Sequence, residues 1–356
     1  MHLSVLDLVP VREGQTSAQA LAASLRLAAL ADRLGFTRYW FAEHHNMPAI
    51  ASTTPPVLIA AAAMRTTRIR LGSGGVMLPN HVPFIVAEQF AALEALAPGR
   101  IDLAIGRAPG SDPVITQVLR AGGMYGNVEQ FPDHVRDVAA LMRPGGALLR
   151  LGATGGPDLA EGPSRPRDYA IAATPAATGT PDVWLLGSSD YSAHLAARLG
   201  LPYAFAYHFA GDGLEEALSI YRGGYEPSPE HPEPQTLLPV NVVVDEDADR
   251  ARTLALPWAR SFARVRAGRP LTAVETVETA TAAAPDPVLD RASSQTLARW
   301  VVGTPDEAAE RIGELGATYN LDEVMLVPVG GAHADDPADR VPSREHTVEL
   351  LAGRLR

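Results

Sequence analysis

The chain alternates short apolar segments with longer amphipathic stretches along most of its length. Eight of the apolar segments have the length and composition of buried strands. We place them at residues 3–8, 39–42, 69–72, 101–105, 183–186, 203–207, 238–244 and 323–327. Helical patterns separate most of these segments, several with Pro or Thr near their start. Repeated strand–helix units predict parallel strands joined by helical crossovers.

Eight parallel strands with intervening helices fit an α/β fold of the TIM-barrel type, (β/α)8, better than an open doubly wound sheet. Three segments interrupt the alternation. Residues 145–182 are rich in Gly, Pro, Ala and Thr, residues 223–236 carry several prolines, and residues 267–298 have an irregular pattern. We therefore expect a single barrel domain over residues 1–356, with insertions in its βα loops at these three places.

The amino-acid composition excludes several classes of binding surface and catalytic group. The 41 acidic residues outnumber the 30 basic ones, and the net charge of -11 argues against a nucleic-acid or anionic-membrane surface. The sequence has no lysine and no cysteine, which excludes Schiff-base and phosphate-loop lysines, disulfides, thiolate nucleophiles and cysteine-held clusters. We see no signal peptide, and no apolar run reaches the roughly 18 residues of a membrane span, so we expect a soluble, cytoplasmic protein.

Barrel enzymes carry their active sites where the strands end and the following loops begin. The second predicted strand is followed directly by Glu43, His44 and His45, which are candidates for acid/base chemistry or metal binding. Successive side chains of an extended segment point to opposite sides, so we expect one histidine to face the pocket and the other to support it.

The residues at the ends of the third and fourth predicted strands are weaker indicators of a functional site. A glycine-rich run at 72–79 permits a close ligand approach, but an ordinary tight turn explains it equally well. Arg107 follows the fourth strand, where a cation needs a partner. It either pairs with an acid such as Asp102 or Asp112, or binds the anion of a ligand.

The strongest signal for an anion follows the fifth strand. There an apolar strand runs through Gly187 into Ser188 and Ser189, which open a helix that also carries Ser192. Exposed N–H groups, hydroxyls and the positive end of the helix dipole favour a phosphate, although simple helix capping is the alternative. Arg107 follows the neighbouring strand and could grip the same phosphate, whereas Asp190 should face solvent.

Two further histidines, His81 and His208, follow predicted strands. With His44 and His45 they could form a metal site, as a metal-dependent hydrolase would require. The first strand offers Asp7 but no paired histidines, so the usual spacing of barrel metal hydrolases is missing. We expect no metal.

Taken in order, these segments resemble the bacterial luciferase-like flavin monooxygenases. The resemblance covers most of the chain outside the three insertions, and no one motif decides it. The matching runs are WFAEHH at 40–45, GSGGVMLP at 72–79, PGRID at 98–102, GR at 106–107, WLLGSS at 184–189 with Ser192, LGLPYAFA at 199–206, VGTPDEA at 302–308 and DEVM at 322–325.

The resemblance implies a barrel that binds reduced FMN at the carboxyl ends of its strands. It implies that Arg107 holds the flavin phosphate together with Ser188, Ser189 and Ser192. It also implies a cis peptide bond between Gly74 and Gly75 beneath the flavin ring. Met77, Gly106 and Gly187 belong to the same matching runs and count as cofactor-binding residues.

The reaction that the resemblance implies is attack of O2 on reduced flavin, which gives a C4a-hydroperoxide that oxygenates a small organic substrate. His44 corresponds to the family's catalytic histidine and His45 to its neighbour, and His44 would act as the acid/base. A separate NAD(P)H:flavin reductase would supply the reduced FMN, and a homodimer is possible because the family often forms dimers.

Two departures from the luciferases themselves argue against light emission. Gly106 stands where the luciferase catalytic subunit has a reactive cysteine, and only Asp112 lies near the place of its acidic residue. The chain therefore resembles the non-luminescent, single-chain branch. An F420-dependent hydride-transfer oxidoreductase and a non-catalytic flavin-binding protein remain alternatives on the same fold, and no motif identifies the substrate.

Overall fold

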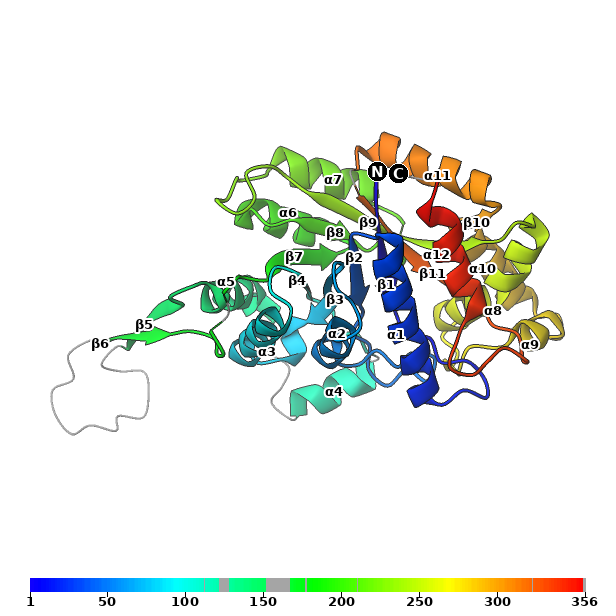
Figure 1. The fold of residues 1–356 in the computed structure, drawn as a ribbon, viewed down its shortest axis with the longest axis horizontal. Coiled ribbons are helices and arrows are strands. Elements are labelled where there is room, and N and C mark those ends of the chain that lie inside the picture. The colour runs from blue at the N-terminus through cyan, green and yellow to red at the C-terminus, as the bar shows by residue number, and fades with distance from the viewer. Residues whose placement is uncertain are drawn as a thin grey trace.

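The computed structural model describes residues 1–111, 113–121, 128–151, 167–176, 178–209, 211–321 and 323–354 (Figure 1). Within these ranges eight parallel strands close into a barrel, because the last of them pairs with the first. This confirms the predicted (β/α)8 architecture. The barrel strands, in order around the ring, are β1 (His2–Asp7), β2 (Arg38–Phe41), β3 (Arg70–Met77), β4 (Ile101–Gly106), β7 (Asp182–Gly187), β8 (Tyr203–Phe205), β9 (Thr236–Val244) and β11 (Glu323–Pro328).

Helices surround the barrel and form part of the connections between its strands (Figure 1). None of the described helices is long and apolar enough to cross a membrane. Their bounds are α1 (Ser17–Leu34), α2 (Pro55–Ala63), α3 (Pro83–Leu96), α4 (Pro113–Ala121), α5 (Phe131–Met142), α6 (Asp190–Leu199), α7 (Leu214–Gly223), α8 (Ala248–Arg266), α9 (Val277–Thr281), α10 (Pro287–Leu297), α11 (Pro305–Tyr319) and α12 (Pro342–Ala352), with short 3-10 turns at Leu78–Asn80 and Val128–Gln130.

Two layers of apolar side chains hold the fold together. One fills the barrel and includes Leu6, Trp40, Trp184 and Met325. The other lies between the strands and the helices that cover them. Parallel strands buried on both faces are apolar at nearly every position, which explains why the sequence pattern located all eight.

A polar network occupies the amino-terminal end of the barrel interior. Asp102 accepts hydrogen bonds from Arg38, Trp40 and Arg70, and Arg38 also pairs with Glu323 at 2.7 Å. Asp102 is fully buried, and its carboxylate is shared among these donors. Of the two acids considered as partners of Arg107, Asp102 is therefore engaged elsewhere, and Asp112 lies outside the described residues.

The three interruptions of the pattern have different structures. Residues 147–151 and 167–171 form an antiparallel pair, β5 (Ala147–Leu151) and β6 (Arg167–Ile171), which extends away from the barrel (Figure 1). This pair and the loop at 223–236 both lie between a helix and the next strand, not in βα loops as expected.

The segment 267–298 lies in the long connection from β9 to the next barrel strand, β11. It follows α8 (Ala248–Arg266), and half of its residues belong to α9 and α10. It leads into a short strand that the sequence analysis did not predict, β10 (Val301–Gly303), which pairs with the carboxyl half of β9.

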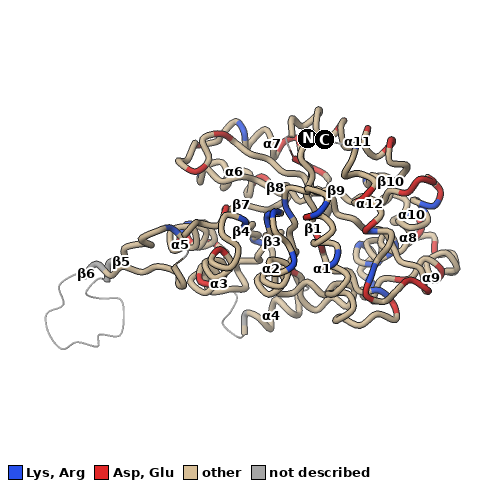
Figure 2. The backbone as a smooth tube through the Cα atoms, viewed as in Figure 1, with Lys and Arg blue, Asp and Glu red and all other residues tan. Residues whose placement is uncertain are grey.

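Charged residues are scattered along the helices and loops. Figure 2 shows arginine positions mixed with acidic ones and not gathered along one element. Several of the arginines form ion pairs with carboxylates, among them Arg136 with Asp133 and Arg311 with Glu314.

Helix α11 begins with a capping box at Thr304. The N–H of Glu307 donates to the hydroxyl of Thr304, and the N–H of Thr304 donates to the Glu307 carboxylate. We expect Thr304→Ala to lower the free energy of unfolding by about 1 kcal/mol, the usual cost of a lost cap. Thr304→Ser is the matched control and should retain the stability. Denaturant unfolding measures both, and equal stability of the alanine variant and the wild type would contradict the assigned cap.

Candidate active site at the carboxyl ends of the strands

The sequence-predicted site residues come together at one edge of the barrel. They lie at or just after the ends of β2, β3, β4 and β7, four strands that are consecutive neighbours in the ring. Their loops therefore lie side by side over the mouth. His44 and His45 follow β2, Gly74, Gly75 and Met77 lie in β3, Gly106 and Arg107 lie at the end of β4, and Gly187, Ser188, Ser189 and Ser192 lie at the end of β7 and the start of α6.

Glu43 organises the first two of these loops. Its Oε1 atom lies 2.8 Å from Nε2 of both His45 and His81, and its Oε2 atom accepts the N–H of Met77 at 3.1 Å. Glu43 is completely buried. Burial alone would raise the pKa of Glu43, but the hydrogen bonds from His45, His81 and Met77 outweigh it and lower the pKa to about 2. The carboxylate is therefore ionised at neutral pH.

The loop after β4 is attached to the same cluster. The N–H of His45 donates to Gly110 O at 2.9 Å, and the amide of Asn80 donates to Pro109 O at 2.8 Å. Gly110 has a positive φ of 62°, and a Cβ there would lie 2.8 Å from the carbonyl oxygen of Glu43. The loops that carry His44, the β3 glycines and Arg107 are therefore fixed relative to one another.

The adjacent histidines differ in their contacts, as the alternation of side chains predicts. His45 contacts Glu43, whereas the Nδ1 atom of His44 is buried and has no hydrogen-bond partner among the described residues. Burial lowers the pKa of His44 below its usual value. His44 is therefore a neutral imidazole at pH 7 that can take or give a proton.

Close packing explains why positions 74 and 75 of β3 are glycine. The Gly74–Gly75 peptide bond is cis, at the place where the resemblance puts one. A Cβ on Gly74 would lie 2.5 Å from Cδ1 of Leu6, and a Cβ on Gly75 would lie 2.7 Å from the carbonyl oxygen of Ala104. Both positions are glycine because neighbouring atoms leave no room for a side chain.

Arg107 has an unusual environment for a cation. Its guanidinium lies 4.0 Å from the ring centroid of Tyr191, in the first turn of α6. In the part of the chain that the structure describes, no carboxylate lies within ion-pair distance of Arg107. The exposed Ser188 and Ser189 precede the same turn, and Asp190 is exposed to solvent as expected. A guanidinium, two hydroxyls and the free N–H groups of a helix start suit an anion such as a phosphate.

Ser192 and Gly187 shape this turn from beneath. The Ser192 hydroxyl donates to Ser189 O at 2.6 Å and lies 3.1 Å from the hydroxyl of Tyr203. A Cβ on Gly187 would lie 2.5 Å from the same hydroxyl. The Ser192 hydroxyl thus already has protein partners, and it stabilises the turn between β7 and α6 from within the fold.

Two of the four histidines considered as metal ligands, His45 and His81, share Glu43. Asp7 pairs with Arg344. Among the described residues, the group whose ligand atoms converge is Asp245, Glu246 and His346. Arg250 pairs with both of these carboxylates, which opposes a cation there.

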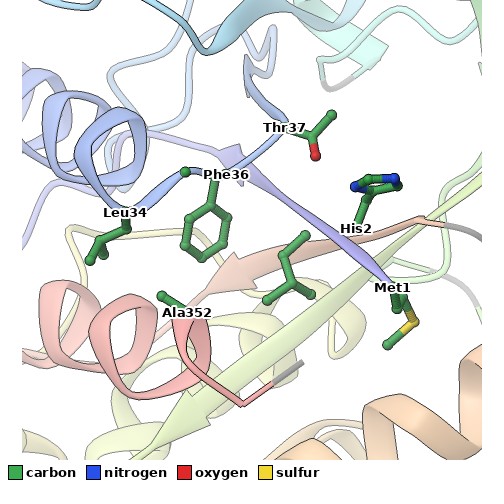
Figure 3. A pocket seen from close by; sticks show the side chains of 8 residues that line it. Met1, His2, Leu34, Phe36, Thr37 and Ala352 are labelled. Atoms are coloured by element: carbon green, nitrogen blue, oxygen red, sulfur yellow. The ribbon is translucent and has the colours of Figure 1, made fainter. Parts of the chain in front are cut away.

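A cavity of about 320 Å³ lies at the other end of the barrel (Figure 3). It is lined by residues of the chain start, the turn after α1 and the end of α12: Met1, His2, Leu3, Leu34, Gly35, Phe36, Thr37 and Ala352. These residues include one imidazole and no carboxylate. Barrel enzymes carry their active sites at the carboxyl ends of the strands, so we place the candidate site at the opposite end from this cavity.

The chain is similar in sequence and in fold to known proteins. Residues 1–319 match the family described as luciferase-like monooxygenase. A luciferase-like monooxygenase of Escherichia coli (strain K12) is 44% identical over 265 residues, which are 74% of this chain and 73% of that protein. The crystal structure of apo-MsnO8 superposes with a TM-score of 0.81 at 32% identity, covering 99% of this chain and 97% of the other.

More distant structures share the fold but differ in cofactor. The oxygenating constituent of 3,6-diketocamphane monooxygenase from Pseudomonas putida, in complex with FMN, gives a TM-score of 0.68 at 18% identity and covers 100% of this chain and 98% of its own. An F420-dependent secondary alcohol dehydrogenase gives 0.61 at 17% identity and covers 98% of both chains. At these identities the likeness establishes the fold alone.

Proposed function

The chain belongs to the luciferase-like monooxygenase family, an oxidoreductase family, and from that premise we propose that it binds reduced FMN and uses O2 to oxygenate a small organic substrate. A separate NAD(P)H:flavin reductase would supply the reduced FMN, as the resemblance to the family implies. The observation that supports the cofactor assignment is Arg107, which follows β4, contacts Tyr191 in the first turn of α6 and has no carboxylate partner among the described residues.

The residues present fit a flavin mononucleotide. Its phosphate would lie between Arg107, the hydroxyls of Ser188 and Ser189, and the first N–H groups of α6. Tyr191 holds the guanidinium in place from below by a cation–π contact. When bound, reduced FMN supplies the electrons that activate O2 for oxygen transfer.

The remaining chemistry belongs to the side chains of the mouth. His44 has a free Nδ1 and a lowered pKa, so it would hold or deliver a proton at that atom. Glu43 would position the loops through His45, His81 and Met77. The apolar interior beneath them, including Trp40 and Trp184, would keep water from the reaction.

Removing the guanidinium tests this assignment. We expect Arg107→Ala to weaken FMN binding by about 1–3 kcal/mol, a rise of roughly 5- to 150-fold in Kd, because a charge-assisted contact to the phosphate is lost. Arg136→Ala is the matched control, since Arg136 forms an exposed ion pair on α5. Quenching of flavin fluorescence measures both constants. Unchanged affinity of Arg107→Ala would remove Arg107 from the phosphate site.

A further inference from the structure

The loop that carries His44 is attached to the loop that follows β1. Residues 49–51 run antiparallel to residues 9–11, and an isolated bridge joins the two segments. At one end of this pairing, the N–H of Ala51 donates to Val9 O at 2.8 Å. We call the paired segments 9–11 and 49–51 the clasp. The clasp fixes the loop after β2 to the end of β1.

The clasp begins at a strained residue. Val9 is buried and has a φ of 52°, and among the described residues it is the one β-branched side chain with a positive φ. Its N–H donates to the Asp7 carboxylate at 2.8 Å. Asp7 is itself fully buried and accepts hydrogen bonds from Tyr39 and Arg344. Such strain persists where the surrounding structure enforces it, and it is concentrated at functional sites.

Ser52 follows the clasp and contacts the backbone on both sides of Glu43. Its carbonyl oxygen accepts the N–H of His44 at 2.9 Å, and its hydroxyl donates to the carbonyl oxygen of Ala42. Ser52 is fully buried. Two hydrogen bonds from this one residue therefore fix the backbone before and after Glu43.

The two adjacent histidines depend on this backbone to different degrees. The ring of His45 is anchored by Nε2, which lies 2.8 Å from the Glu43 carboxylate. The Nδ1 atom of His44 is buried and has no hydrogen-bond partner among the described residues, so that atom does not anchor the ring. A side chain without such an anchor takes its direction from its backbone and its packing. A shift of the peptide group at residue 44 should therefore move the ring of His44 and leave that of His45 in place.

We propose that Ser52 is a positioning residue for His44, which acts by fixing the peptide groups of Ala42 and His44 while the clasp holds Ser52 in place. The functional part of this assignment rests on the proposed function, in which His44 exchanges a proton. Ser52 acts through His44 and does not contact substrate or cofactor. Reacting groups must be placed accurately, since a displacement of about 1 Å can cost about a hundredfold in rate.

Three variants separate positioning from the general cost of losing a buried hydroxyl. Ser52→Ala removes the bond to Ala42 and adds no atoms. Ser52→Gly removes the same bond and also frees the backbone that carries the carbonyl group. Ser24→Ala is the matched control, because Ser24 is buried but its hydroxyl has no partner among the described residues. The effects on His44 should increase in the order Ser24→Ala, Ser52→Ala, Ser52→Gly.

NMR of 15N-labelled protein measures the position of His44 without substrate. We expect Ser52→Ala to speed hydrogen exchange of the His44 amide by about tenfold or more relative to the amide of Met325, which is buried in β11. The ring signals of His44 should shift, whereas those of His45 should stay. Unchanged His44 signals and exchange in Ser52→Ala, or equal changes in Ser24→Ala, overturn the proposal.

Turnover shows whether the displacement affects the chemistry. With a flavin reductase and a substrate found by screening, Ser52→Ala should lower kcat by about tenfold or more and leave KM within about threefold. The reason is that the variant alters the direction of His44 and no binding contact. A less stable Ser52→Ala variant with normal kcat would show a merely structural serine and would overturn the assigned role.

FMN titration of the same samples distinguishes this proposal from the proposed function. The turn from β7 into α6 contains neither Ser52 nor the clasp, so Ser52→Ala should bind FMN with unchanged affinity. Normal FMN binding with His44 undisturbed in Ser52→Ala overturns only the positioning role. Absence of FMN binding in the wild type, with the changes at His44 observed, overturns only the flavin assignment.

Discussion

His44→Ala should lower the turnover of the enzyme by about a hundredfold or more while leaving FMN affinity unchanged. His44 is the imidazole at the mouth with a free buried Nδ1, and its lowered pKa keeps it neutral and ready to exchange a proton at pH 7. It contributes nothing to the anion-binding turn, which follows another strand. Removing it should therefore affect the chemical step and spare cofactor binding.

The measurement is product formation by the variant, supplied with a flavin reductase and a substrate found by screening, alongside an FMN titration. His194→Ala is the matched control, because His194 is an exposed histidine of α6. It should retain both properties. Full turnover by His44→Ala would rule out its acid/base role, and parallel loss of FMN binding would indicate a structural role instead.

Glu43→Gln should destabilise the fold by about 3 kcal/mol at neutral pH. The pKa of Glu43 is about 2 in the folded protein against an ordinary value of 4.5, and about 1.36 kcal/mol corresponds to each unit. Because the folded pKa is the lower one, this stabilisation is fully present above about pH 4.5. It is lost as the pH falls from there through about 2, so the variant should show a flatter acid limb over that range.

A second glutamate provides a sharp control. Glu278 also has a pKa lowered to about 2 by a histidine, His333, but that pair lies at the surface. Solvent screens exposed ion pairs, so Glu278→Gln should change stability little. Denaturant unfolding between pH 2 and pH 7 compares the two variants. Equal effects of the two substitutions would contradict the role of burial at Glu43.

The barrel could be predicted from the sequence because its strands are buried on both faces. One strand was predicted too short: the segment 69–72 was assigned, whereas β3 runs on to Met77. The glycines of that continuation favour a turn when taken locally, but they pair with β4 and pack against Leu6 and Ala104. Register with a neighbouring strand decided the outcome, and local propensity carries no information about it.

The structure of the insertions could not be predicted from local sequence patterns either. The segment 145–182 has the composition of a loop, and the antiparallel pairing of β5 with β6 depends on contacts that no short motif specifies. Its placement before β7 leaves the segment after β9, with α9 and α10, as the insertion at the mouth. We therefore expect the shape of the substrate pocket to depend on residues 267–298 more than on the β5–β6 pair.

The site divides into parts that are local in sequence and parts that are not. The turn from β7 into α6 could be predicted because Ser188, Ser189 and the helix start are consecutive, and its proposed phosphate partner Arg107 follows the adjacent strand. The carboxylate of Glu43 was noticed beside the histidines, but its bond to His81 joins two loops and appears only when β2 and β3 are neighbours.

The most direct test of the central claim is an anaerobic titration of the purified protein with FMN, reduced FMN and F420. The account predicts binding of reduced FMN in preference to F420, and weakened binding of FMN when Arg107 is replaced by alanine. Tighter binding of F420 would contradict oxygenation and indicate hydride transfer, and binding of neither cofactor would contradict the flavin assignment altogether.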